Sequence, residues 1–149
     1  DLALFALCAE ALGSMEQAVA LTVDYTRNRQ QFGVPLARFQ VLQHRMVDMQ
    51  THVEQARSLV YLAASLIDTG DSEAQAQGSM SRTQAVAAMQ VLVIEAARYV
   101  SQQAVQLHGG MGVTDEMAIS HHFKRLLATG LRCGTAAQHL DRYASLTAG

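Results

Sequence analysis

Apolar side chains recur at alternating steps of four and three residues throughout residues 39–69. This spacing keeps them on one face of an α-helix, whereas a β-strand would place alternate residues on one face. The apolar positions are Leu42, Met46, Met49, Val53, Ala56, Val60, Ala63 and Ile67. The chain must therefore bury one face of a helix roughly 45 Å long against other elements.

Four further helices are predicted, at residues 2–28, about 80–107, about 115–128 and about 136–146. Thr114 and Thr135 are the expected N-caps of the last two helices, and Gly130 is expected to end the fourth. Loops are predicted at 30–38 and at the small, polar stretch 71–79. Because no segment alternates as a strand does, we expect an all-α fold. It is an up-and-down four-helix-bundle-like domain with short helices appended at its C-terminus.

The composition indicates one globular domain, since half of the 149 residues are hydrophobic and 16% are charged. A net charge of −2 without a basic cluster argues against a nucleic-acid partner. No apolar run reaches the ~18 residues of a membrane span, and no basic stretch precedes the first apolar residues. We therefore expect neither a membrane span nor a signal peptide, and a cytoplasmic location. The missing initiator Met and the helical start suggest a piece of a longer protein.

Three glycines, Gly109, Gly110 and Gly112, separate the predicted third and fourth helices. Glycine adopts positive φ without steric cost and lets another molecule approach the backbone. The exposed N–H groups of such a loop can hold a phosphate or the edge of a flavin. An ordinary helix C-cap followed by a turn is the alternative.

The segment after the first helix, Arg29 to Gly33, is a second candidate binding element. An arginine just past a helix can form two hydrogen bonds with one phosphate. Phe32 can lie against a ring, and Gly33 permits a sharp exit. The alternative is a helix C-cap with a hydrophobic contact.

Cys133 precedes Gly134 and the expected N-cap Thr135, a position that would lower the pKa of its thiol and favour a nucleophile. A small buried cysteine is the alternative. The adjacent His121 and His122 would point about 100° apart on a helix and could not easily share an ion. We therefore predict no metal site.

Two motifs together, Tyr25 to Gln40 and Gln106 to Thr114, resemble the C-terminal helical domain of the acyl-CoA dehydrogenase family. The likeness covers essentially all 149 residues in the family's order and spacing. Family members carry an N-terminal helical domain and a β domain ahead of this one, and both are absent here. The resemblance implies an FAD enzyme that desaturates acyl-CoA thioesters, with a glutamate taking the α proton and flavin N5 the β hydride.

The resemblance also implies that FAD lies partly across a subunit interface, in a homodimer or homotetramer. The expected FAD contacts are Arg29, Gln30, Gln31, Phe39, Gln40, Gln106, Leu107, His108, Gly109, Gly110 and Thr135. The isolated domain is expected to lack FAD and to be inactive.

The family's catalytic carboxylate is missing from both of its usual positions. Counting without gaps from Gln106 places Cys133 at the usual glutamate. The alternative position, on the first helix, holds Ala3, and Leu4 replaces the neighbouring arginine.

Three functions remain open. The first is a dehydrogenase whose base comes from another position or from an unlike subunit, as the glycine loop's looser likeness to small subunits of dicarboxylyl-CoA dehydrogenases suggests. The second is a flavin-dependent monooxygenase on the same fold. The third is a non-catalytic scaffold or partner subunit.

Overall fold

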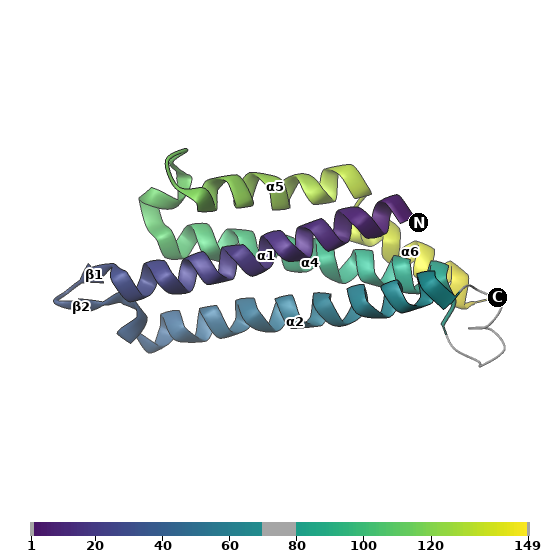
Figure 1. The fold of residues 1–149 in the computed structure, drawn as a ribbon, viewed down its shortest axis with the longest axis horizontal. Helices are drawn as coiled ribbons and strands as arrows, with labels where there is room; N and C mark the ends of the chain where they lie inside the picture. The colour runs from purple at the N-terminus through teal and green to yellow at the C-terminus, as the bar shows by residue number, and fades with distance from the viewer. Residues whose placement is uncertain (1, 70–79, 149) are drawn as a thin grey trace.

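Long helices lying side by side form the molecule in the computed structural model, which describes residues 2–69 and 80–148 (Figure 1). The helices are α1 (Leu2–Asn28), α2 (Gln40–Thr69), α4 (Arg82–His108), α5 (Ala118–Cys133) and α6 (Ala136–Thr147). Two short 3₁₀ helices, η1 (Leu36–Arg38) and η2 (Gly109–Val113), lie between them. The predicted all-α fold is confirmed, while the predicted loop 71–79 lies outside the described residues.

The two longest predicted helices, 2–28 and 39–69, agree with α1 and α2 to within one residue. The predicted apolar face of α1 is also confirmed, because Cys8, Leu12, Met15 and Val19 are all buried. Each fully buried side chain of this kind contributes about 1.5–3 kcal/mol relative to its exposed state. The periodic spacing therefore identified both the helix and its core face.

The prediction for the fourth helix is wrong at both ends. Thr114 does not cap it: the hydroxyl of Thr114 donates to the Met111 carbonyl at 2.9 Å, and α5 begins only at Ala118. Gly130 does not end the helix either, because its backbone is helical. The helix continues to Cys133 and is terminated by Gly134, whose φ of 93° lies in a region that favours glycine.

A short β-hairpin follows α1, where the sequence analysis predicted only a loop. Its strands are β1 (Gln30–Gln31) and β2 (Val34–Pro35), which pair antiparallel. Two-residue strands are too short to show alternation, and this explains the missed prediction. The hairpin projects from one end of the bundle in Figure 1.

The core is arranged around α4, which packs against α1, α2, α5 and α6. Its N-terminus is fixed by a capping box, in which the Ser81 hydroxyl accepts from the Gln84 N–H and the Gln84 side chain accepts from the Ser81 N–H. Side chains such as Val86, Met89 and Val93 are completely buried. The position of α4 therefore determines where the other helices can lie.

Helix α1 is, among the described helices, long and apolar enough to span a membrane by length and composition. The sequence has no uninterrupted apolar run of that length, but the mean hydropathy of α1 is high enough. It is weak evidence for a span, because the core helix of a soluble protein passes the same test. In this fold α1 packs against α2, α4 and α5.

The buried amide of Gln90 is expected to reduce the stability of the fold. Its side chain on α4 is fully buried, and neither amide atom has a hydrogen-bond partner within the described residues. A buried polar group without a partner costs about 1–3 kcal/mol. We expect Gln90→Met, a replacement of similar volume, to raise the free energy of unfolding by about this amount in urea titrations.

Gln102→Met is the matched control, because Gln102 is an exposed residue of the same helix and its replacement should change stability little. A lower free energy of unfolding for Gln90→Met would contradict the prediction.

Candidate functional site

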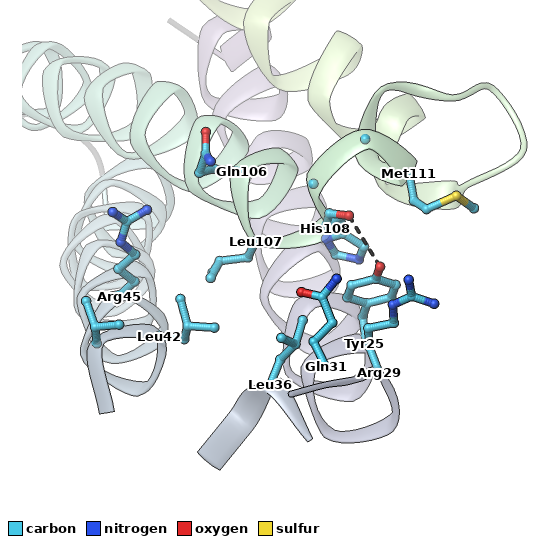
Figure 2. A pocket seen from close by; sticks show the side chains of 13 residues that line it. Tyr25, Arg29, Gln31, Leu36, Leu42, Arg45, Gln106, Leu107, His108 and Met111 are labelled. Atoms are coloured by element: carbon cyan, nitrogen blue, oxygen red, sulfur yellow. Dashed lines mark hydrogen bonds between the residues drawn. The ribbon is translucent and has the colours of Figure 1, made fainter. Parts of the chain in front are cut away.

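A pocket with a volume of about 610 Å³ lies at the hairpin end of the bundle (Figure 2). It forms where the end of α1, the hairpin, the start of α2 and the end of α4 meet. Its lining residues are Tyr25, Arg29, Gln31, Leu36, Val41, Leu42, Arg45, Gln106, Leu107, His108, Gly109, Gly110 and Met111. Residues more than 60 positions apart in the sequence thus share one site.

The hairpin places Arg29 and Gln31 at the pocket. Helix α1 ends with the Arg29 N–H donating to the Tyr25 carbonyl at 2.8 Å, and the Leu36 N–H then donates to the Arg29 carbonyl at 2.9 Å. Between them Phe32 and Gly33 take φ values of 55° and 78°, as the two central residues of a type I′ turn do. Because neighbouring strand residues face opposite sides, Gln30 does not line the pocket whereas Arg29 and Gln31 do.

The glycine loop forms the opposite wall. Gly109 caps α4 with φ 62°, and its N–H donates to the Gln106 carbonyl. A Cβ at Gly112 would lie 2.8 Å from the Val105 carbonyl oxygen, so no side chain fits there. By contrast, nothing lies within 4 Å of a Cβ at Gly109 or Gly110. Gly112 therefore lets the chain turn tightly, while Gly109 and Gly110 leave an open backbone surface.

His108 and Tyr25 join the two walls. Their rings stack with centroids 4.3 Å apart, and the Tyr25 hydroxyl donates to the His108 carbonyl at 3.3 Å. His108 Nδ1 lies 2.8 Å from the Ala104 carbonyl, which can only accept, so Nδ1 carries the hydrogen. Burial lowers the pKa of His108 below the ordinary value of 6.5, although the bond to Ala104 opposes this change. The ring is therefore neutral near pH 7, and Nε2 is an acceptor.

Two arginines give the pocket its electrostatic character. Arg29 comes from the segment after α1 and Arg45 from α2, and none of the lining residues is acidic. Guanidinium groups stay charged at all physiological pH values and bind phosphates with two hydrogen bonds. With the leucines and Met111, the pocket is suited to an anionic ligand that also carries an apolar or planar part.

Comparisons with known proteins identify the family of this chain. The family model described as "Acyl-CoA dehydrogenase, C-terminal domain" matches residues 4–145. The chain belongs to the acyl-CoA dehydrogenase C-terminal domain family. The resemblance inferred from the two sequence motifs is thereby confirmed.

Individual relatives cover nearly the whole chain. Acyl-CoA dehydrogenase IpdE2 of Mycolicibacterium smegmatis is 35% identical over 142 residues, which are 95% of this chain and 41% of that protein. The structure of butyryl-CoA dehydrogenase from Megasphaera elsdenii has a TM-score of 0.83 and 29% identity, covering 98% of this chain and 36% of the other. The ChsE4–ChsE5 complex from Mycobacterium tuberculosis has a TM-score of 0.88 and 26% identity, covering 97% and 37%. The chain thus spans about two fifths or less of these relatives.

Most residues that the sequence predicted for this acyl-CoA dehydrogenase domain line the pocket, but four do not. Gln30, Phe39, Gln40 and Thr135 lie outside the lining. Phe39 contacts Phe32 edge to face, with centroids 6.2 Å apart. Thr135 caps α6, as predicted, with its hydroxyl accepting from the Gln138 N–H at 3.2 Å.

Tyr25 and Arg45 were not among the predicted site residues. Tyr25 is the first residue of the motif Tyr25 to Gln40, and its place in that motif could have identified it as a site residue. Arg45 carries no comparable signal, because a cation on an exposed helix face is ordinary in sequence. Only the packing of α2 beside the hairpin brings Arg45 to the pocket.

Cys133 does not occupy an activating position. It is the last residue of α5, and burial raises the pKa of its thiol despite the nearby charge of Arg132. The reading of Cys133 as a thiol of lowered pKa is wrong, and the reading as a small buried cysteine, which the sequence favoured, is confirmed. The other cysteine, Cys8, is also buried, and its pKa is raised to about 12.

Helices α1 and α5 run antiparallel. As a result, Ala3 and Cys133, which stand at the family's two carboxylate positions, come to the same end of the bundle. Ser14 Oγ lies 2.8 Å from His122 Nδ1, and Glu10 forms an ion pair with Arg125. The same pairing extended toward the start of α1 brings Ala3 to the end of α5, where Cys133 lies. The described residues contain no group of three or more His, Cys, Asp and Glu side chains suited to a metal ion.

The lowered pKa of His108 predicts an acid-sensitive fold. Because the folded state favours neutral His108, this contribution to stability is complete above about pH 6.5 and is lost as the pH falls through the lowered folded-state pKa. We expect the free energy of unfolding to fall as the pH drops below about 6.5, and His108→Phe to reduce that fall.

His122 is the matched comparison for His108, because it lies outside the pocket and its pKa is also lowered. The main cause is burial, and the charge of His121 adds to it. Removing both histidines should flatten the pH dependence further. An unchanged acid loss in His108→Phe would show that the ring is not responsible.

Proposed function

We propose that this chain is the C-terminal domain of an FAD-dependent acyl-CoA dehydrogenase-like oxidoreductase. In this proposal it contributes FAD contacts and an oligomer interface, while an unlike acyl-CoA dehydrogenase subunit supplies the catalytic base. The observation that carries the proposal is the pocket with two arginines, an open glycine backbone and no acidic side chain. When bound, FAD accepts the hydride from the β carbon of the acyl-CoA.

The residues present fit part of an FAD molecule. Arg29 and Arg45 would hold the pyrophosphate, and the open backbone at Gly109 and Gly110 would admit a group that a side chain would exclude. Leu42 and Leu107 offer apolar contacts to a ring. One pocket of this size on a single domain holds only an edge of the cofactor, so we expect the isolated chain to purify without FAD.

The absent base supports an assembly of unlike subunits. Removal of the α proton requires a base within hydrogen-bond reach of it. The buried thiol of Cys133 has a raised pKa, and Ala3 carries no titratable group. The similar ChsE4–ChsE5 structure is, by its title, a complex of two differently named proteins. A domain of this fold can thus occur in such an assembly, and a partner subunit would supply the missing carboxylate.

The cofactor role is tested on the full-length assembly with Arg29→Met and Arg45→Met. Loss of a hydrogen bond to a charged group costs about 1.5–3 kcal/mol, so each variant should bind FAD about 10–100-fold more weakly. The measurement is FAD affinity by flavin fluorescence. Arg98→Met, which removes an exposed arginine of α4 outside the pocket, should leave the affinity unchanged. Unchanged affinity in both pocket variants would overturn the assignment.

The missing base generates a second prediction. The full-length homo-oligomer should not desaturate acyl-CoA, because loss of a general base typically costs about 10²–10⁴-fold in rate. Cys133→Glu restores a carboxylate at the family's position and should give partial activity. Adding Leu4→Arg should improve it by orienting that carboxylate.

The assay is anaerobic bleaching of flavin absorbance by a panel of acyl-CoA thioesters. Cys133→Gln is the control for side-chain size, since it fills the same space without a titratable group. Rapid bleaching by the unmutated homo-oligomer would show that the chain carries another base.

A further inference from the structure

A small pocket lies between α1 and α5, beside Cys133. It is lined by Leu7, Glu10, Ala11, Arg125, Thr129 and Arg132, and we call it the Arg132 pocket. Cys133 follows Arg132 directly and ends α5. The positive charge of Arg132 acts on the Cys133 thiol, where it opposes the rise in pKa that burial causes. The pocket therefore adjoins the position that the family resemblance assigns to the catalytic glutamate.

The Arg132 pocket carries a positive charge that no acidic side chain balances. Of its two arginines, Arg125 forms an ion pair with Glu10, which is the acidic residue of the lining. Arg132 has no hydrogen-bond or ion-pair partner among the residues that the structure describes. A guanidinium in this state can bind a carboxylate through two parallel hydrogen bonds.

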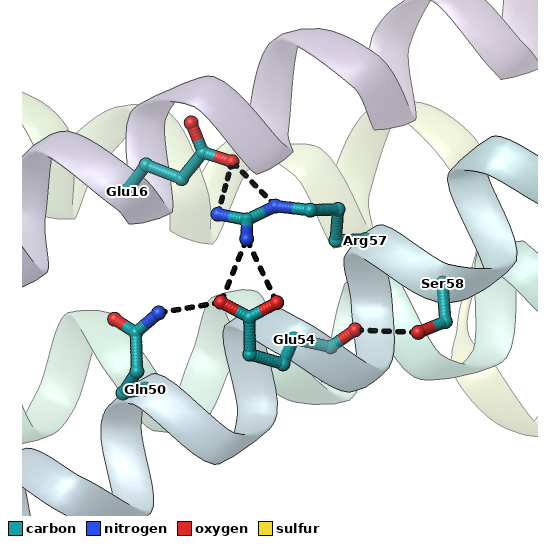
Figure 3. A network of polar contacts seen from close by, with 5 residues as sticks. All are labelled: Glu16, Gln50, Glu54, Arg57 and Ser58. Atoms are coloured by element: carbon teal, nitrogen blue, oxygen red, sulfur yellow. Dashed lines mark hydrogen bonds and ion pairs between the residues drawn. The ribbon is translucent and has the colours of Figure 1, made fainter.

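Arg57 shows how this chain satisfies an arginine that joins two helices (Figure 3). Its Nη1 lies 2.7 Å from both carboxylate oxygens of Glu54, and its Nη2 lies 2.9 Å from Glu16 of α1. The Nε of Arg57 donates to the same Glu16 oxygen at 3.2 Å. All three nitrogens of that guanidinium are thus bonded within the chain, whereas those of Arg132 are available to a ligand.

Apolar side chains flank the Arg132 pocket. Leu7 and Ala11 of α1 form part of its wall. Leu131, next to Arg132, is 88% exposed, and Leu2 at the start of α1 is 67% exposed. The start of α1 and the end of α5 lie at the same end of the bundle (Figure 1). A ligand that combines a short hydrocarbon chain with an anionic end matches this surface.

We propose that Arg132 binds a carboxylate carried by the acyl group of the substrate, so that the substrate is a short acyl-CoA with a second, free carboxyl group. This inference rests on the proposed function, because the resemblance brings the α carbon of the acyl group to position 133. Neighbouring Cα atoms are about 3.8 Å apart, so an acyl group of roughly four to six carbon atoms can extend from position 133 to the Arg132 guanidinium. Arg132 then determines specificity and takes no part in proton removal.

Equilibrium binding of two matched thioesters to the full-length protein tests the proposal. Glutaryl-CoA and pentanoyl-CoA have acyl chains of the same length and differ at the far end, where the first carries a carboxylate and the second a methyl group. Isothermal titration calorimetry measures both affinities without any need for turnover. We expect glutaryl-CoA to bind about 10–100-fold more tightly, because only its carboxylate can pair with Arg132.

Substitutions of Arg132 test whether this residue causes the preference. Arg132→Met should weaken glutaryl-CoA binding about 10–100-fold and leave pentanoyl-CoA binding unchanged. Arg132→Lys keeps the charge but loses the paired hydrogen bonds, so it should retain part of the preference. Arg98→Met, which removes an exposed arginine of α4 outside this pocket, is the matched control and should bind both thioesters normally. Circular dichroism verifies that each variant keeps its helices.

The outcomes separate this inference from the proposed function on which it rests. Equal binding of the two thioesters by the unmutated protein would overturn the carboxylate assignment and leave the proposed function standing. An equal loss of both thioesters in Arg132→Met would also overturn it, and would indicate that Arg132 pairs with a carboxylate of the protein assembly. Binding of neither thioester would overturn the proposed function together with this inference.

Discussion

The close packing of α4 against four other helices is the constraint on which the rest of the structure depends. A helix covered on several sides must be apolar on several sides, and the α4 residues Ala85, Val93, Ala97 and Val100 are buried. Alanines keep neighbouring helices close, while the larger Val and Met side chains fill the space between them. This packing fixes the position of the C-terminal end of α4 in space. It thereby places His108 and the glycine loop against α1.

The pocket is a consequence of three helix ends meeting, and not of a cavity within the core. Helix α1 ends at Asn28, α4 ends at His108 and α2 begins at Gln40, all at the hairpin end of the bundle. The Tyr25–His108 stack links two of these ends through a ring contact and a hydrogen bond. Because each element is anchored in the bundle, the backbone at Arg29, Arg45 and the glycine loop is held in place before any ligand binds. Such preorganisation reduces the entropy lost on binding.

The parts of this structure that sequence reasoning predicted are those governed by local rules. The face of α1 follows from spacing, and the Thr135 cap follows from side-chain chemistry. The failures occurred where two local signals competed. Thr114 has the chemistry of an N-cap, yet its hydroxyl closes the preceding 3₁₀ turn, and Gly130 stays helical because packing outweighs its low helix propensity. Arg45 was missed because its place in the pocket depends entirely on tertiary packing.

The two chemically distinct regions lie at opposite ends of the bundle (Figure 1). The pocket is at the hairpin end, whereas Cys133 and the start of α1 are at the other, separated by much of the length of α4. At about 1.5 Å per residue, its 27 residues extend roughly 40 Å. Substitutions so far apart with no shared partner affect stability independently. A change at the Cys133 end of the bundle can therefore leave the arginines and the glycine loop at the other end in place.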